Sequence, residues 1–68
     1  MSDSIKSRFD DSAYLLQCMQ HLAYYRMDTL INMQSMDAAS FAVLSSAIIA
    51  LRKASTVSSA LSGMVGHD

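Results

Sequence analysis

The segment from Asp37 to Leu61 most constrains what this chain can fold into, because it predicts one helix that is apolar or small-sided on almost every face. One stripe at three- and four-residue spacing comprises Phe41, Leu44, Ile48 and Leu51. A second stripe beside it comprises Val43, Ala47, Ala50, Ala54, Val57 and Leu61. A helix with a single neighbour buries one stripe against it, so the other stripe predicts contact with another polypeptide.

The size of the chain strengthens this expectation. Its 68 residues predict a single small domain, and 51% of them are hydrophobic whereas 16% are charged. A domain of this size buries only about 60% of the surface that its unfolded chain exposes. Two helices alone cannot cover so much apolar surface, and oligomerisation or a permanent partner is the usual solution for small scaffolds.

Helical periodicity divides the chain into two helices. Residues 1–9 are polar and are expected to be frayed, whereas Asp10 offers a side-chain acceptor for the free amides of a helix start. We expect the first helix from about 10–34 and the second from about 37–62, with 63–68 as a short tail.

The joint between these helices lacks Pro and Gly, but Ser35 and Asp37 are both good capping residues. Gly63 is well placed as the residue past the end of the second helix. The many hydroxyl residues from Ser55 to Ser62 leave open whether the helix persists there. No alternation of period two competes, so the predicted fold is all-α, an antiparallel two-helix hairpin completed by a partner chain or by dimerisation.

The sequence offers no set of residues for catalysis, for a cofactor or for a metal ion. Cys18 and His21 have a spacing that two metal ligands can share, but nothing nearby completes four ligands. Asp10 and Asp11 are adjacent, so they point in different directions on a helix and are explained by capping. A hairpin also has no concave pocket around a nucleophile. We therefore expect a protein that is not an enzyme.

Charge and hydropathy restrict the partners and the compartment. The formal net charge is −1, and no cluster of Lys and Arg is present to neutralise phosphates, which disfavours nucleic-acid binding. The first residues lack the apolar core of a secretory signal. Only 14 uncharged residues separate Asp37 from Arg52, fewer than the roughly 20 that span a bilayer. The chain is expected to be cytoplasmic, without membrane contact.

Two sets of residues are assigned from the stripes. The hairpin seam is assigned to Leu15, Met19, Leu22, Phe41, Leu44, Ile48 and Leu51. The partner surface is assigned to Tyr25, Val43, Ala47, Ala50, Ala54, Val57 and Leu61. Both stripes of the second helix are apolar, so the sequence leaves open which faces the seam and which faces the partner.

One segment of the second helix carries a family resemblance. It reads Asp37-Ala38-x-x-Phe41-x-Val43, followed by Ala50-Leu51-x-x-Ala54-x-x-Val57. An early aromatic residue followed by an alanine-rich stripe resembles the small co-chaperones of type III secretion needle subunits, of the YscE, PscE and EscE type. The resemblance implies a two-helix hairpin that binds a chaperone of tetratricopeptide-like helical repeats. Together the two would keep the needle subunit unpolymerised in the cytoplasm before export.

Two alternative functions need the same apolar helix. A homodimeric four-helix-bundle regulator would cover the second stripe by self-association, although an RNA-binding member of that class should show a basic stripe. A phage- or plasmid-encoded inhibitor would place the helix in a groove of a host protein. Binding to a membrane surface is disfavoured, because few cationic side chains flank the apolar stripes.

Overall fold

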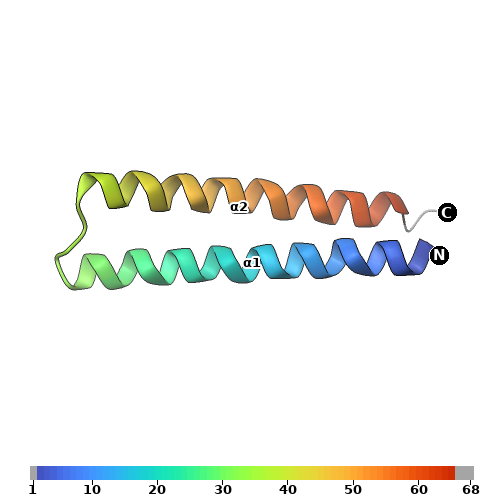
Figure 1. Ribbon diagram of the computed structural model, residues 1–68, viewed down its shortest axis with the longest axis horizontal. Helices are drawn as coiled ribbons and strands as arrows, with labels where there is room; N and C mark the ends of the chain where they lie inside the picture. Colours follow the sequence, from blue (N-terminus) through green and yellow to red (C-terminus); the bar gives the residue numbers. More distant parts are fainter. Residues whose placement is uncertain (1, 66–68) are drawn as a thin grey trace.

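The computed structural model describes residues 2–65, and the side chains of residues 4–65, as two α-helices, α1 (Ser2–Asn32) and α2 (Ala38–Val65). The helices run antiparallel, so that the start of α1 and the end of α2 lie at the open end of a hairpin (Figure 1). The longest dimension is 51 Å, close to the roughly 46 Å of a 31-residue helix. Residues 2–65 contain no strand, and the predicted all-α hairpin is confirmed.

The helices meet along a seam in which spacings of three and four residues alternate, as in a coiled coil. The seam residues of α1 are Lys6, Phe9, Ala13, Leu16, Gln20, Ala23, Met27 and Leu30. The seam residues of α2 are Leu44, Ile48, Leu51, Ser55, Ser58, Ser62 and Val65. Every one of them is buried or half-buried.

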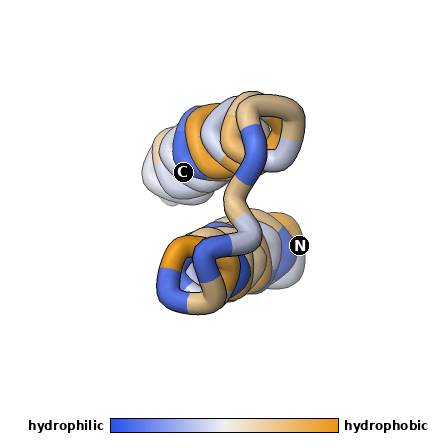
Figure 2. The backbone as a smooth tube through the Cα atoms, turned by 90° about the vertical axis from the view of Figure 1, so that its left-hand side faces the viewer, coloured by the Kyte–Doolittle hydropathy of each residue, from blue (hydrophilic) through white to orange (hydrophobic). Residues whose placement is uncertain are grey.

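This seam buries little apolar surface. Among residues 4–65, Ala13 and Ile48 are the buried apolar residues and Ser55 and Ser62 the buried polar ones. The accessible surface is 5074 Å², whereas a compact protein of this mass exposes about 4200 Å². Figure 2, viewed along the long axis, shows apolar segments at several positions around both coils. The hairpin therefore leaves much apolar surface uncovered.

The structure corrects the expected frayed N-terminus, because α1 begins at Ser2 rather than near Asp10. Lys6 and Phe9 continue the seam spacing into this part of the chain, and Lys6 contacts Ser62 across the seam. Packing against the last turns of α2 thus stabilises residues that lack strong helical patterning of their own. Met1 lies outside the described residues.

The second helix also extends further than expected. It is helical from Ser55 to Ser62, where the hydroxyls of Ser55 and Thr56 donate to the carbonyl of Arg52. It then continues through Gly63, which has no positive φ and therefore does not terminate the helix. The rest of the expected tail, residues 66–68 with His67, lies outside the described residues.

The connection between the helices satisfies the backbone groups at both helix ends. Gln34 adopts a left-handed φ of 56°, and its amide donates to the Ile31 carbonyl at 2.9 Å. The Ser35 amide donates to the Leu30 carbonyl at 2.8 Å, which completes a Schellman motif. At the start of α2, Asp37 Oδ1 accepts from the Ser40 amide at 2.6 Å as an N-cap.

Gly63→Ala is expected to stabilise the hairpin by up to about 1 kcal/mol, because Gly is a poor residue inside a helix. A Cβ placed at Gly63 has no atom within 4 Å. Chemical denaturation of both proteins measures the difference in the free energy of unfolding. A loss of stability would instead indicate a left-handed Gly63 that ends the helix.

Gln34→Gly is expected to raise the free energy of unfolding by about 1 kcal/mol, because Gly adopts the left-handed conformation without the steric cost that Gln bears. Met33→Gly is the matched control, since Met33 does not have a positive φ. That control should destabilise the protein. If urea denaturation gives both variants the same sign, the left-handed turn is not the cause.

Candidate protein-interaction surface

The heptad seam determines which side chains border it on each side. Some seam residues are followed by the next seam residue three positions later. In each helix, one flank is formed by the residues directly before these seam residues, together with the residues three positions after each of those flank residues. Because reversing one helix of a pair mirrors the order of its positions, these two flanks lie on the same side of an antiparallel hairpin. They bring the exposed apolar residues of α1 beside those of α2.

We call this side the apolar face. It is made up of Ile5, Leu15, Met19 and Leu22 of α1 with Val43, Ala47, Ala50, Ala54, Val57, Leu61 and Met64 of α2. Ala47 and Ala54 are half-buried at the border of the seam, and the other members are exposed. The apolar face extends along most of the hairpin and joins both helices.

A hollow of about 340 Å³ near the closed end shows that the two flanks meet. Its lining residues are Arg26, Leu30, Ala39, Ser40, Val43 and Leu44. Arg26 belongs to the flank of α1 that also carries Met19, and Val43 belongs to the apolar face of α2. The hollow therefore lies on the same side as the apolar face.

The opposite side of the hairpin is more polar. Its polar residues are Asp10, Gln17, His21 and Asp28 of α1 with Ser45, Arg52, Thr56 and Ser59 of α2. This side also carries four exposed aromatic or aliphatic residues, which interrupt its polar surface: Tyr14, Tyr24, Ile31 and Ile49. The two broad sides of the hairpin thus differ in chemistry: the apolar face is continuous along α2, whereas Arg8, Ser12 and Arg26 interrupt it on α1.

The structure corrects four residues assigned to the hairpin seam. Leu15 is 60% exposed, Met19 45%, Leu22 67% and Phe41 54%. Leu15, Met19 and Leu22 form a short stripe on α1. At the same spacing, the next residue before this stripe is Ser12 and the next after it is Arg26, so a longer seam in this register would contain a polar and a charged residue. The register that contains Phe9 and Leu16 runs without a charged residue from there to the end of α1. In α2, the assigned residues Leu44, Ile48 and Leu51 do lie in the seam.

Most of the residues assigned to the partner surface lie together on the apolar face. Val43, at 68% exposed, is among them. Tyr25 is 73% exposed but lies on the side of α1 that faces away from α2, so the structure does not bring it to the others. Ile5 and Met64 were not assigned, and the heptad register of the two helices is the sequence signal that could have found them.

Cys18 and His21, the two residues considered for metal binding, are not joined by further ligands among the described residues. Cys18 is half-buried and His21 is exposed, both on α1. Within the described part of the chain, no three His, Cys, Asp or Glu side chains gather in a way that could hold a metal ion.

By length and composition alone, α2 could cross a membrane, a property that it shares with many core helices of soluble proteins. Only a small part of its most apolar window is buried in the hairpin. Arg52 and Lys53 lie near the middle of α2, where a membrane-spanning helix loses about 2.5–3.5 kcal/mol for each charged side chain.

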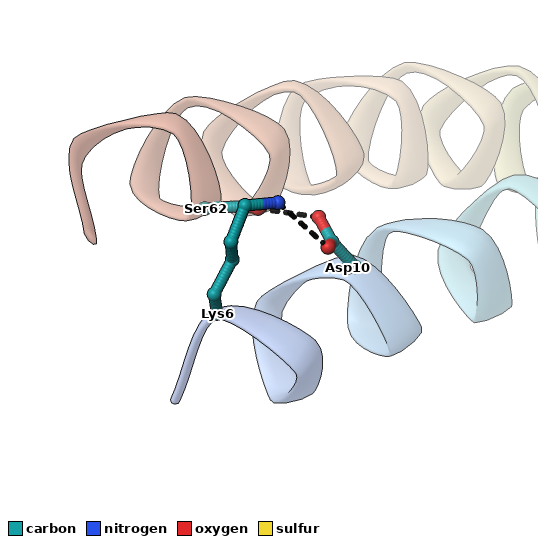
Figure 3. Close-up of polar contacts among 3 residues, drawn as sticks. All are labelled: Lys6, Asp10 and Ser62. Carbon is teal, nitrogen blue, oxygen red and sulfur yellow. Dashed lines mark hydrogen bonds and ion pairs between the residues drawn. The ribbon is translucent and has the colours of Figure 1, made fainter. Parts of the chain in front are cut away.

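A polar cluster connects the helices at the open end of the hairpin (Figure 3). Lys6 Nζ donates to Asp10 Oδ2 at 3.0 Å and to Ser62 Oγ at 3.3 Å. The hydroxyl of Ser62, which is buried, donates to Asp10 Oδ1. Because Lys6 and Asp10 are partly exposed, their ion pair alone contributes little to stability. The bonds to Ser62 instead hold the two helices in one register.

Two carboxyl groups are stabilised in their charged form by this fold. The hydrogen bond from Ser62, followed by that from Lys6, lowers the pKa of Asp10 below its usual value of 3.8. The backbone amide of Ser40 lowers the pKa of Asp37 at the start of α2. Each group therefore stabilises the folded state while it is charged.

Acidification is expected to destabilise the hairpin. A carboxyl group with a lowered folded pKa contributes stability above its unfolded pKa of about 4, and this contribution is lost as the pH falls through the folded pKa. The melting temperature measured by circular dichroism should therefore fall below about pH 4. Asp10→Asn combined with Asp37→Ser, which retains a capping side chain, should weaken this dependence. An unchanged acid profile in the double variant would contradict the assignment.

Comparison with protein-family models, with curated proteins and with solved structures finds no match.

Proposed function

We propose that this hairpin is a non-enzymatic interaction module whose apolar face is covered by a helical partner. The observation that supports the proposal is the unbroken run of exposed and half-buried apolar residues along α2, which this face joins to Leu15, Met19 and Leu22 of α1. The seam between the helices buries little in comparison: within residues 4–65, the buried apolar residues are Ala13 and Ile48. A surface of this kind on a soluble protein marks a site of protein contact.

The size of the apolar face is compatible with a stable complex. Its exposed members present on the order of 800 Å² of apolar surface, about the area that each partner contributes to a standard interface. At about 25 cal/mol per Å², complete burial contributes about 20 kcal/mol before costs. The loss of translational and rotational freedom opposes it by about 4–15 kcal/mol, and each side chain that becomes ordered costs about 0.5–1.5 kcal/mol more. A net gain therefore requires a partner of complementary shape that also buries apolar surface of its own.

The specific role that we propose is that of a co-chaperone in type III secretion. The residues of the family resemblance include Val43, Ala50, Ala54 and Val57, which all belong to the apolar face. In this proposal, the face binds a chaperone built of tetratricopeptide-like helical repeats. The pair then keeps a needle subunit unpolymerised in the cytoplasm, because a subunit that polymerises through an apolar helix must stay covered until export.

Ala50→Asp is expected to abolish partner binding, because it places a charge in the middle of the apolar face. The helix content measured by circular dichroism should be retained, since Ala50 is exposed. The assay is co-purification of the tagged hairpin with the repeat chaperone and the needle subunit. Ala42→Asp is the matched control, because Ala42 is exposed on α2 away from the apolar face.

Three outcomes would contradict the proposal in different ways. Equal recovery of the partner by Ala50→Asp and the unmodified chain would reject this surface. An isolated chain that stays monomeric and thermally robust at high concentration would reject the need for a partner. A stable dimer in sedimentation would favour the homodimeric four-helix bundle instead.

A further inference from the structure

The charged residues of the hairpin are distributed unevenly around it. Arg8 and Arg26 lie on the flank of α1 that forms part of the apolar face, and both are exposed. Of the described acidic side chains, Asp10 and Asp28 lie on the opposite side, Asp11 lies on the side of α1 that faces away from α2, and Asp37 lies in the connection, where it accepts from the Ser40 amide. Apart from Asp37, whose carboxylate bonds to Ser40 at the rim of the hollow, the charges on the side of the apolar face are therefore cationic.

Arg26 lies beside an apolar hollow. It lines the hollow of about 340 Å³ together with Leu30, Val43 and Leu44. Within residues 4–65, the structure shows no ion pair or side-chain hydrogen bond of Arg26. The Ser40 amide at the rim is already bonded to Asp37. The guanidinium is thus a free donor beside a hollow whose other lining residues, apart from Ser40, are apolar.

This combination selects the chemistry of what binds there. A guanidinium presents its donors in a planar fork that matches the two oxygens of a carboxylate. The hollow is open to solvent, so such a pair is strengthened only when the docked partner itself excludes water from it. A partner helix with carboxylates beside its apolar stripe complements both features.

We infer that the partner, whose existence rests on the function proposed above, docks an acidic amphipathic helix on the apolar face. Its apolar stripe lies along the small residues Ala47, Ala50 and Ala54, and one carboxylate enters the hollow to pair with Arg26. Arg8 lies 18 residues earlier on α1, about 27 Å along the helix. A second carboxylate at that distance completes the charge match.

The same charges disfavour a second copy of this chain as the occupant. A symmetric dimer through the apolar face would bury Arg8 and Arg26 of both copies in one interface. The acidic residues Asp10 and Asp28 lie on the other side and cannot pair with them. A buried charge without a partner is strongly destabilising. The arginines therefore provide specificity for a different, acidic chain.

The test uses three fluorescein-labelled helical peptides with one Leu and Ala stripe and with Glu, Gln or Lys on both flanks. Fluorescence anisotropy with the full chain measures their affinities. The Glu peptide is expected to bind about tenfold more tightly than the Lys peptide. Arg26→Glu should reverse this preference. Arg52→Glu, on the opposite side, changes the net charge equally and should preserve it.

The outcomes separate this inference from the proposed function. Equal binding of all three peptides would overturn the acidic partner and leave the apolar docking face in place. Equal effects of Arg26→Glu and Arg52→Glu would show attraction by net charge alone and overturn the role of Arg26. Binding of no peptide by a chain that sediments as a monomer would overturn both proposals. A dimer that excludes the peptides would assign the face to a second copy.

Discussion

The close approach of two helices along a narrow seam is the constraint on which the rest of this structure depends. Ala13, Ser55 and Ser62 are among the most buried residues, and their small side chains allow the backbones to pack closely. Small residues also bury little apolar area, so close packing limits the stability that the seam supplies. Several large apolar side chains, among them Leu15, Leu22 and Val57, are left exposed on the flanks, where another chain can reach them.

The two ends of the hairpin hold this seam in register. At the closed end, Gln34 takes the left-handed position of a Schellman motif, and Asp37 caps the following helix. At the open end, Ser62 is buried between Lys6 and Asp10. With both ends held, the flanks of α1 and α2 stay aligned, and an apolar side and a more polar side are maintained along the hairpin.

Much of the fold could be predicted from local patterns, but the seam of α1 could not. That helix carries two apolar registers, one through Leu15 and Leu22 and one through Phe9 and Leu16. In the middle of α1, the large side chains of Leu15, Met19 and Leu22 favour the first register, although Ser12 and Arg26 interrupt it further along the helix. The second register places the small residue Ala13 of α1 in the same seam as the small residues Ser55 and Ser62 of α2. Its choice therefore depends on a segment of α2 that is distant in the sequence. The stripe of α2 that was assigned to a partner lies beside the seam, and its role in binding stays a prediction.

The sequence by itself determined that the chain forms two helices, that they break near Ser35 and that their apolar surface exceeds what two helices can cover. These properties follow from periodicity, capping residues and composition, which act locally. The tertiary structure decided where the helices end, which stripe of α1 faces α2 and that Arg26 shares a hollow with Val43. Those features depend on how side chains from distant segments fit together. Whether two side chains fit sterically across a seam depends on both residues of the pair, so the pattern of one helix alone does not decide it.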